Sequence, residues 1–460
     1  MKNKQSISGI YLWIWIIIGA AATACNKDWL DGKPDKSLVV PETITQLQAI
    51  LDNDAQLNAS YGGLGDIGAD DYFVSYTVWQ SAINAQERNA YIWNKEIFEN
   101  EPCFDWLNLY QKIFYCNVAL DGINRVIPSA AEKANWENVK GSALFFRAYC
   151  FFELAQLFAK PYNEATAATD LGIPLKVSSD INESPARATL QLTYKKILDD
   201  LQQAKAYLPV TSPYKTRPSV LSVNALLARI YLSMGHYREA WKAADDCLQQ
   251  YNTLINYNTL TLTAARPFGL FNSEVILHTT MSGYYILQLS TRAKVDTLLY
   301  RSYDNNDLRQ KAFFNYGNAS SIVFKGNYSG GIARFTGLAI DEVLLTRAEC
   351  YARDNKTAEA MNDLNTLLLN RWKTGTFVPL AATDAKDALV QIITERRKEL
   401  LFRGLRWMDL RRLGMEPDLA VTPTRMLNGN NYSIAPGDAR YAYPIPDEEV
   451  RLNGLLQNER

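Results

Sequence analysis

Residues 224–250 read NALLARIYLSMGHYREAWKAADDCLQQ, and this stretch decides the fold class. Apolar residues recur every three or four positions on both sides of Gly235, which predicts two helices separated by a glycine turn. Ala228, Tyr231 and Tyr237 fit the tetratricopeptide pattern, in which small side chains let two antiparallel helices approach and aromatic rings fill the space between them. The stretch therefore predicts a helix pair.

The same arrangement recurs further along the chain. A shift of 120 residues places Tyr351 where Tyr231 stands and Asn355 where Gly235 stands, and a third, more divergent unit begins near Leu144. Such pairs bury their apolar faces only by stacking, so the predicted fold is mainly α, with tetratricopeptide-like helix pairs stacked in one body. Apolar residues have helical spacing over 104–127, 136–159, 189–207, 220–234, 237–250, 341–353, 357–370 and 386–402.

Two long regions between these helices follow a different pattern. Residues 54–100 are rich in glycine and aromatic residues and show little helical period. Residues 251–340 contain short β-like runs at Ser273–Thr280 and Ser320–Lys325. Long insertions in a helical body are usually functional or disordered, and the aromatic content argues against disorder. We therefore predict that these two regions are functional insertions of irregular loops and short β segments. The tyrosines of the second region are Tyr284, Tyr285, Tyr300, Tyr303 and Tyr316.

Composition narrows the function further. The chain has 460 residues, 47% of them apolar, and its 48 basic side chains nearly balance 49 acidic ones. A chain whose charges nearly cancel has no broad positive potential to attract the phosphate backbone of a nucleic acid, so we predict no nucleic-acid partner. The chain has only two histidines, and no Cys or His cluster has metal-ligand spacing. No nucleotide-binding glycine motif stands between a strand and a helix. We predict no metal and no cofactor.

The first 24 residues have the features of a signal peptide. Lys2 and Lys4 precede an apolar run over 10–24, which at about 1.5 Å per residue is too short to span a bilayer. The run ends in small residues directly before Cys25 and resembles a bacterial lipobox, whose cysteine is lipidated and becomes the mature N-terminus. The alternative is an ordinary signal peptide followed by a coincidental cysteine. With a lipobox, acyl chains hold the mature body, 25–460, on a membrane surface.

The chain resembles the SusD/RagB family over nearly its whole length. These are surface lipoproteins of Bacteroidetes that pair with SusC-type TonB-dependent transporters. The resemblance implies one body with an N-terminal SusD-like region over 25–210 and a C-terminal SusD/RagB region over 211–460. It also implies that the irregular loops and short β segments form the ligand-binding half of this body. The motifs that carry it are, in order, Cys25 followed by Trp29-Leu30-Asp31, KGSALFFRAY at 140–149, the helix pair at 224–250, ERRKELLFRGLRWMDLRR at 395–412 and YPIP at 443–446.

The resemblance also implies a function. Such a lipoprotein is anchored in the outer membrane, faces the cell exterior, captures an oligosaccharide or a peptide, and closes as a lid over a β-barrel transporter without catalysis. Glycans are the more frequent ligands, and we expect a helix-repeat face to dock the barrel. The family platform combines aromatic residues from the early and the central irregular regions, which implies ligand contacts at Tyr72, Trp79, Tyr284 and Tyr285. Aromatic faces stack on ligands, and a tyrosine hydroxyl can orient them.

Carboxylates cluster in the glycine-rich loop just before Tyr72. Asp66, Asp70 and Asp71 could accept hydrogen bonds from sugar hydroxyls, fix the loop as a turn or cap, or collect a Ca²⁺ ion, although EF-hand spacing is absent. We place Asp70 and Asp71 among the candidate ligand contacts.

Charged residues also crowd 395–412. Glu395 and Glu399 share one helix face, so salt links to Arg396 or Arg403 are available nearby. We interpret this segment as a helix end that fixes the C-terminal region to the core, against the alternative of a binding or catalytic site. Two further alternatives for the whole chain are a glycosidase with two carboxylates and a scaffold without a small ligand.

Overall fold

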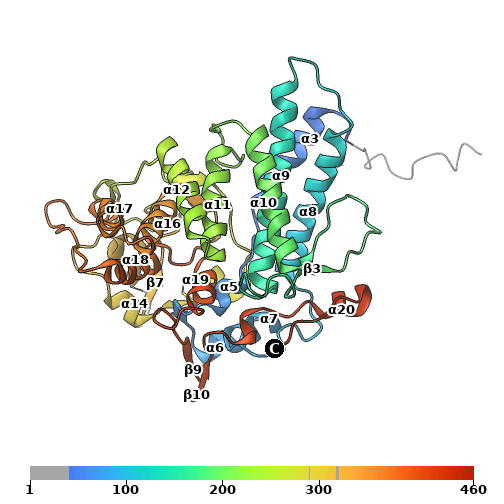
Figure 1. The fold of residues 1–460 in the computed structure, drawn as a ribbon. Coiled ribbons are helices and arrows are strands. Elements are labelled where there is room, and N and C mark those ends of the chain that lie inside the picture. The colour runs from blue at the N-terminus through green and yellow to red at the C-terminus, as the bar shows by residue number, and fades with distance from the viewer. Residues whose placement is uncertain (1–40, 290, 317–320) are drawn as a thin grey trace, which may run out of the picture. The chain divides into compact units, whose positions relative to one another are not determined.

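Consecutive helices, each packed against the next, form the frame of this computed structural model (Figure 1). All eight stretches predicted to be helical are helices, with ends that differ from the prediction by at most four residues. The prediction of a mainly α fold is confirmed. The helices are α8 (Phe104–Ile123), α9 (Lys133–Phe158), α10 (Leu190–Tyr207), α11 (Val220–Met234), α12 (Tyr237–Gln250), α16 (Ile340–Arg353), α17 (Thr357–Leu369) and α18 (Ala385–Glu399).

The structure describes residues 41–289, 291–316 and 321–460. The predicted signal peptide, 1–24, and Cys25 lie outside these residues. Within the described residues, no helix combines the length and the apolar character that crossing a membrane requires.

Two equivalent turns confirm the repeat seen in the sequence. Helix α11 begins with a capping box between Ser219 and Ser222 and ends at Gly235, which has a φ of +75°. Between α16 and α17 the equivalent position is Asn355, with a φ of +59°. Glycine and asparagine are the residues that adopt this left-handed conformation most readily, which explains why these two residue types occupy equivalent positions.

The early region is more helical than the sequence indicated. It contains α4 (Asp54–Leu57), α5 (Leu64–Gly68), α6 (Tyr76–Gln80) and α7 (Ala85–Tyr91). None of these helices is longer than about two turns, so no helical period could emerge from the sequence. The first longer helix of the body, α3 (Ile44–Leu51), begins with a capping box at Thr43 and packs on α8.

A four-stranded sheet joins the two irregular regions. Its strand order is β1-β5-β7-β6, and every neighbouring pair is antiparallel. The strands are β1 (Tyr72–Phe73), β5 (Lys294–Val295), β7 (Ile322–Phe324) and β6 (Phe314–Tyr316). Strand β1 comes from the early region and the other three come from the central region. The short helices of the central region are η1 (Tyr257–Thr259), α13 (Tyr285–Gln288), α14 (Thr297–Arg301) and α15 (Arg309–Phe313).

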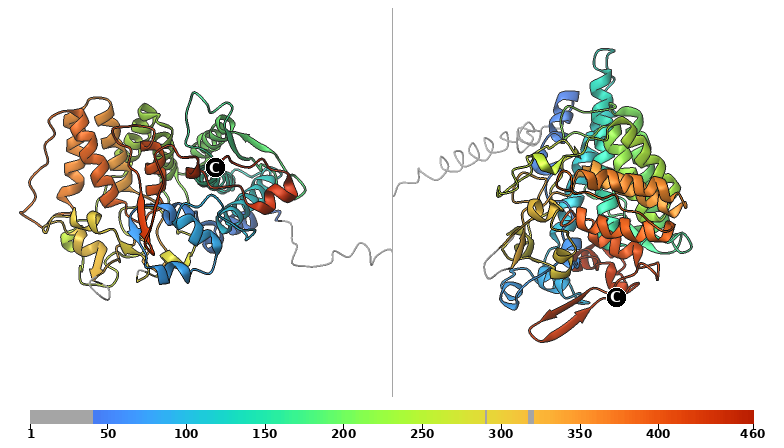
Figure 2. Two further views of the ribbon diagram at one scale, coloured as in Figure 1. Left: turned by 90° about the horizontal axis from the view of Figure 1, so that it is seen from below. Right: turned by 90° about the vertical axis from the view of Figure 1, so that its left-hand side faces the viewer.

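Three two-stranded sheets and the C-terminal elements complete the fold. The hairpin of β9 and β10 projects from the body (Figure 2, right). The pairs are β2 (Leu171–Pro174) with β3 (Arg187–Thr189), β4 (Val275–Leu277) with β8 (Leu338–Ala339), and β9 (Thr424–Leu427) with β10 (Asn430–Ser433). The remaining helices are α19 (Arg406–Leu413), η3 (Ala439–Tyr441) and α20 (Asp447–Asn453).

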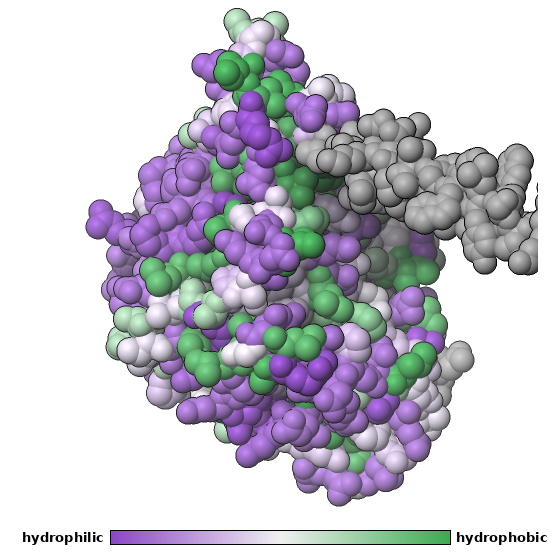
Figure 3. All heavy atoms as spheres, turned by 90° about the vertical axis from the view of Figure 1, so that its right-hand side faces the viewer, coloured by the Kyte–Doolittle hydropathy of each residue, from purple (hydrophilic) through white to green (hydrophobic). Residues whose placement is uncertain are grey.

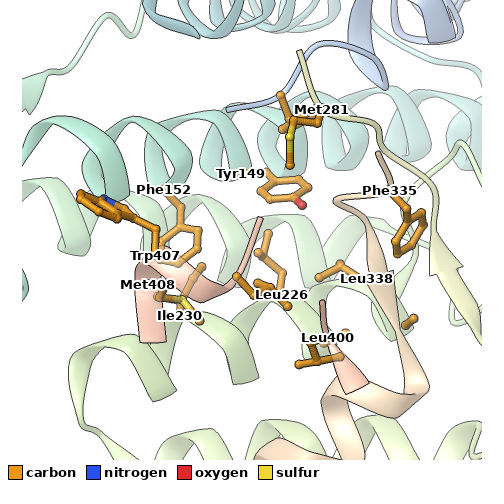
Figure 4. Packing of buried hydrophobic residues seen from close by; sticks show 14 of the residues in the cluster. Tyr149, Phe152, Leu226, Ile230, Met281, Phe335, Leu338, Leu400, Trp407 and Met408 are labelled. Atoms are coloured by element: carbon orange, nitrogen blue, oxygen red, sulfur yellow. The ribbon is translucent and has the colours of Figure 1, made fainter. Parts of the chain in front are cut away.

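The main hydrophobic core is continuous from Leu47 to Leu455, and part of it lies where the helix repeat meets the C-terminal segment. Side chains from α9, α11 and α19 converge there, as Phe152, Ile230 and Met408 show in Figure 4. Trp407 is 2% exposed and its ring stacks on Tyr443 at 5.3 Å between centroids. The five cysteines of the described residues are buried and free of disulfides.

The charged segment at 395–412 fixes the core, but with partners other than those predicted. Glu399 accepts hydrogen bonds from Arg309 (3.0 Å) and Arg371 (2.8 Å), and Glu395 accepts one from Arg309. Arg403 instead pairs with Asp341. The segment does contain internal pairs, Arg396 with Asp409 and Lys398 with Glu395. The predicted links of Glu395 and Glu399 to Arg396 or Arg403 were wrong, because both carboxylates point into a buried interface where Arg309 and Arg371 reach them.

Candidate functional site

The two aspartates predicted as ligand contacts belong to ion pairs. Asp70 accepts from Arg406 at 2.6 and 3.0 Å, and Asp71 accepts from Arg397 at 2.9 Å. Burial alone would raise the pKa of Asp70, but Arg406 reverses this effect and holds that pKa well below its usual range. In this structure both carboxylates anchor their loop to the C-terminal segment, which corresponds to the loop-fixing alternative.

Two of the predicted aromatic contacts are buried. Tyr72 is 3% exposed, and its ring packs against Tyr91 and Phe402. Tyr284 is 2% exposed and fills the space above Gly63, where a Cβ atom would lie 2.7 Å from the ring. Both had been expected on an exposed platform. Instead, both rings point into the protein interior, so neither presents a face to solvent.

The other two predicted aromatic residues do reach the surface. Trp79 is half-buried and stacks on the exposed Tyr76, with centroids 5.7 Å apart and planes inclined by 26°. The indole N–H of Trp79 donates to the carbonyl of Arg88 at 2.9 Å, which orients the ring. Tyr285 is also half-buried, and the guanidinium of Arg292 lies 3.5 Å from its ring centroid.

The four-stranded sheet brings the two irregular regions onto one surface. Phe73 pairs with Lys294, Lys294 with Val323, and Val323 with Asn315. Residues directly opposite in antiparallel strands share a face, so these four side chains form one row across the sheet. Phe73 and Asn315, at the two ends of the row, are exposed and Lys294 is half-buried, but Val323 is only 7% exposed. Tyr72 and Val295, on the opposite face, are buried. We call this outer row the sheet platform.

A pocket of about 410 Å³ opens at the β6 edge of the sheet. Tyr316 and Ile322 of its lining face the side of the sheet opposite to the platform, and Asn315 at the edge belongs to both. Tyr300 from α14 and Phe314 and Tyr316 from β6 supply its rings. The hydroxyl oxygens of the two tyrosines lie 3.4 Å apart. Tyr316 is 70% exposed. Polar side chains of the lining are Thr263, Gln310, Lys311, Asn315 and Lys325. We call this cavity the Tyr316 pocket.

The Tyr316 pocket is polar, and the described residues that line it include two lysines, Lys311 and Lys325, and no carboxylate. Burial and the neighbouring Tyr316 hydroxyl raise the pKa of Tyr300 to about 12, so its phenol stays protonated at physiological pH. Lys325 donates to the carbonyls of Leu262 at 2.7 Å and Ala264 at 3.1 Å, which holds it as part of the wall. The pocket therefore offers ring faces, hydroxyl groups and amide groups together, with two lysine side chains in its wall.

Sequence reasoning did not select the residues of this pocket. Tyr300 and Tyr316 belong to the tyrosine-rich central region, but they are 16 positions apart and share no motif. The available signal was the aromatic density of the whole region. What singles out these two rings is the placement of α14 beside β6, which is a tertiary contact.

Three buried carboxylates meet the geometric requirement for a metal site. Oxygen atoms of Glu274, Asp341 and Glu399 lie within 4.8 Å of one another. Arginines already neutralise them, because Arg371 bonds to both Glu274 and Glu399, and Arg403 bonds to Asp341. The guanidinium groups thus supply the positive charge that a metal ion would otherwise bring. The three carboxylates are part of an ion-pair network in the protein interior.

Comparison with known proteins identifies the family. A family profile described as "Starch-binding associating with outer membrane" matches residues 28–232, and the profile of the SusD family matches residues 228–459. The chain is 24% identical over 418 residues to SusD-like protein P2 of Formosa agariphila, covering 77% of this chain and 79% of that protein.

Solved structures share the fold. A SusD superfamily protein from Bacteroides thetaiotaomicron aligns over 91% of this chain and 100% of its own, with a TM-score of 0.75 and 23% identity. A laminarin-binding SusD-like protein aligns over 90% and 97%, with a TM-score of 0.64 and 18% identity. Surface glycan-binding protein A of Bacteroides fluxus aligns over 91% and 99%, with a TM-score of 0.68 and 18% identity. With the two profiles matched in sequence along the chain, this protein belongs to the SusD family.

Proposed function

We propose that this protein is a surface lipoprotein that binds a glycan in the Tyr316 pocket and along the sheet platform. Lipidated at Cys25, it is held in the outer membrane and faces the cell exterior. It delivers the glycan unchanged, as a lid, to a SusC-type TonB-dependent transporter. The helix repeat forms its rigid frame, and the two irregular regions form its binding half.

The observation that carries this proposal is the composition of the Tyr316 pocket. A sugar ring has apolar faces and a rim of hydroxyl groups, so it is matched by aromatic faces with hydrogen-bonding groups beside them. Tyr300 and Tyr316 supply the faces, and Gln310 and Asn315 supply amide groups. At the other end of the platform, Tyr76 and Trp79 offer a second stacked pair. A glycan longer than one ring could use both.

Two further observations support a glycan as the ligand and support binding without hydrolysis of that ligand. The structural relatives include one described as laminarin-binding and one described as surface glycan-binding. No Asp or Glu occurs among the described residues that line the Tyr316 pocket, whereas hydrolysis of a glycosidic bond requires two carboxylates about 5–9.5 Å apart. The pocket thus lacks the pair that a glycosidase of this type would use.

Isothermal titration against a panel of glucans, other plant glycans and peptides tests the ligand class. We expect a saturable signal with at least one glycan, a loss of at least tenfold in affinity for Tyr316→Ala, and no product formation. The matched control is Tyr214→Ala, which removes an exposed tyrosine from a different segment. Saturable binding of peptides alone would overturn the glycan assignment, and hydrolysis of a bound glycan would overturn the binding role.

Membrane attachment and delivery have separate tests. Metabolic labelling with a radioactive fatty acid should mark the wild-type protein and leave Cys25→Ser unlabelled. The membrane-bound protein should copurify with a large β-barrel chain in mild detergent. Recovery of the wild-type protein alone under several detergents would contradict the lid role.

A further inference from the structure

The Tyr316 pocket, which lies by α14 and β7 in Figure 1, has positive charge in its wall. Lys311 from α15 and Lys325, directly after β7, belong to its lining, whereas no Asp or Glu does among the described residues. Lys311 is exposed and Lys325 is half-buried. Neither lysine forms an ion pair with another residue that the structure describes. The two charges therefore stand in the pocket without a counterion from the described chain.

Lys325 is held in a fixed position in the wall of the pocket. Its ammonium group donates to the carbonyl oxygens of Leu262 at 2.7 Å and Ala264 at 3.1 Å. These carbonyl groups orient the ammonium group but bring no net negative charge. An ammonium group has three N–H donors, so the two bonds leave one donor for a ligand. Partial burial lowers the pKa of Lys325, as expected for a cation without a compensating carboxylate.

The missing counterion of Lys325 is unfavourable for the free protein. Partial burial removes water from its ammonium group, and no opposite charge compensates for the loss. Lys196 on α10 is also half-buried, but it pairs with the carboxylate of Asp200 at 2.9 Å. Lys325 borders an open pocket instead of a carboxylate. An anionic group of a ligand in the pocket would supply the compensation that Asp200 gives to Lys196.

The segments around the pocket expose more basic than acidic side chains. The two acidic residues that are not buried there are engaged locally, because Asp296 accepts from the amide of Leu299 at 2.8 Å and Asp304 accepts from that of Asn306 at 2.7 Å. Among the described residues of 262–266 and 294–325, the basic residues that are not buried are Arg266, Lys294, Arg301, Lys311 and Lys325. This excess of positive charge favours an anionic ligand.

A further lysine lies on the sheet platform. Lys294 pairs with Val323, and Val323 pairs with Asn315, which also lines the pocket. Neighbouring strands are about 4.8 Å apart, so Lys294 stands roughly 9–10 Å from Asn315 across the sheet. A glycan that occupies both the pocket and the platform therefore meets lysines at two separate places. This arrangement matches a chain that carries an anionic group on more than one sugar.

We propose that the ligand of the Tyr316 pocket is an acidic glycan, whose carboxylate or sulfate group pairs with Lys325 and Lys311. Its sugar ring stacks on Tyr316, and an acidic group further along the glycan pairs with Lys294. This inference rests on the function proposed above, because it names the class of glycan that binds at the same site. Lysine is a point charge without the planar fork of arginine, so it pairs with either anion.

Titration calorimetry with matched pairs of ligands tests the charge of the glycan. Oligogalacturonate and oligoalginate are compared with their carboxyl-reduced forms, and carrageenan oligosaccharides with their desulfated forms. We expect one acidic form to bind at least tenfold more tightly than its neutral partner, and the pair that differs identifies the anion. That affinity should fall at least fivefold between about 0.05 and about 0.5 M NaCl, because salt screens the ion pairs.

The possible failures of this experiment are distinguishable. Equal or tighter binding of the neutral forms, or binding of laminarin alone, overturns the acidic class and leaves the glycan-binding function standing. Absence of binding to every saccharide overturns both this inference and the proposed function.

Charge-removing variants supply the second readout. Lys325→Met should lower affinity for the acidic oligosaccharide at least tenfold and leave affinity for its neutral partner unchanged. Lys311→Met should lower the first affinity about fivefold, and because Lys311 is exposed, this variant carries the test if Lys325→Met does not fold. An equal loss of affinity for both forms would show that the lysines maintain the shape of the pocket, which would overturn their pairing with an anion.

The matched control is Lys133→Met, which should bind both forms like the wild type. Lys133 begins α9, its side chain is 69% exposed, and it pairs with Glu137 only at 3.9 Å. Helix α9 lies away from α14 and β7, towards the side of the body that Figure 3 shows, where hydrophilic and hydrophobic side chains are interspersed. A loss of acidic-glycan affinity in Lys133→Met equal to that in Lys311→Met would contradict a specific role of the pocket lysines.

Discussion

Arg406 and Asp70, which are 336 residues apart in the sequence, form a bidentate ion pair. The guanidinium of Arg406 donates to the two carboxylate oxygens of Asp70 at 2.6 and 3.0 Å. Both side chains are largely buried, so each depends on the other for compensation of its charge. Arg397 reaches the same loop and pairs with Asp71 at 2.9 Å. The C-terminal segment thereby holds the early loop in place, which sets the position of β1 at the edge of the sheet platform.

Removing one partner of this pair should be costly. We expect Asp70→Asn to lower the free energy of unfolding at pH 7 by about 3–5 kcal/mol, because it leaves the Arg406 charge buried without a counterion. The pKa of Asp70 is depressed in the folded state, so the pair's contribution is present above the unfolded pKa of about 4 and is lost as pH falls below it. Urea unfolding at pH 7 and pH 3 should show the difference between variant and wild type narrowing in acid.

The control for this prediction is Asp418→Asn. Asp418 pairs with Lys386, but both side chains are more than 70% exposed and screened by solvent, so the substitution should leave the free energy of unfolding close to that of the wild type. Equal costs for the two variants would contradict the structural role of Asp70.

Asp66 should make the protein less stable as pH rises. Asp66 is 3% exposed, and one of its carboxylate oxygens has no hydrogen-bonding partner among the described residues. Burial, together with the nearby Asp71 carboxylate, raises the pKa of Asp66 to about 7. In the unfolded chain the Asp66 carboxyl ionises near pH 4, whereas in the folded protein it stays protonated up to about pH 7. The free energy of unfolding therefore falls between pH 4 and 7 by up to roughly 4 kcal/mol. Asp66→Asn removes this titration. Unfolding at pH 5 and pH 8 should show a smaller decrease for the variant, and the exposed Asp354→Asn should behave like wild type.

Substitutions at the two equivalent turns of the helix repeat should differ in their effect on stability. Gly235→Ala should lower the free energy of unfolding, and Asn355→Gly should not. Gly235 has open space around it, so Gly235→Ala introduces no clash and costs only the left-handed backbone conformation, about 1–2 kcal/mol. Asn355→Gly relieves the same constraint and should not lower stability. Thermal unfolding of the two variants would measure this. A loss of stability in Asn355→Gly equal to that in Gly235→Ala would show that side-chain contacts of Asn355 decide its position.

The hydroxyl of Tyr300 should contribute to ligand affinity separately from its ring. Tyr300→Phe keeps the stacking face and removes one hydrogen-bonding group, so we expect glycan affinity to fall about fivefold to tenfold, which corresponds to about 1 kcal/mol. Because the pKa of Tyr300 is about 12, the affinity of the wild type should stay constant from pH 6 to 9. Titration calorimetry of both proteins at pH 6, 7.5 and 9 would check this, and an unchanged affinity in Tyr300→Phe would exclude the hydroxyl from binding.

Local patterns sufficed to predict the helices of the body and the two turns of the repeat. A helix face shows its period within a dozen residues, and the turn between paired helices requires glycine or asparagine, so α11, α12, α16 and α17 were predicted within one residue of their ends. The short helices α4 to α7 were missed because none extends beyond about two turns. The motifs at 140–149 and 395–412 indicated the family, which both profiles then confirmed.

The sequence by itself thus determined the fold class, the repeat and the family. Which aromatic rings face solvent was decided only by the tertiary structure. Tyr72 and Tyr284 turn inward, Tyr300 and Tyr316 meet at a pocket, and Asp70 is engaged by Arg406. The physical reason is that burial and charge pairing depend on contacts between residues far apart in the chain, whereas helical periodicity is a property of neighbours.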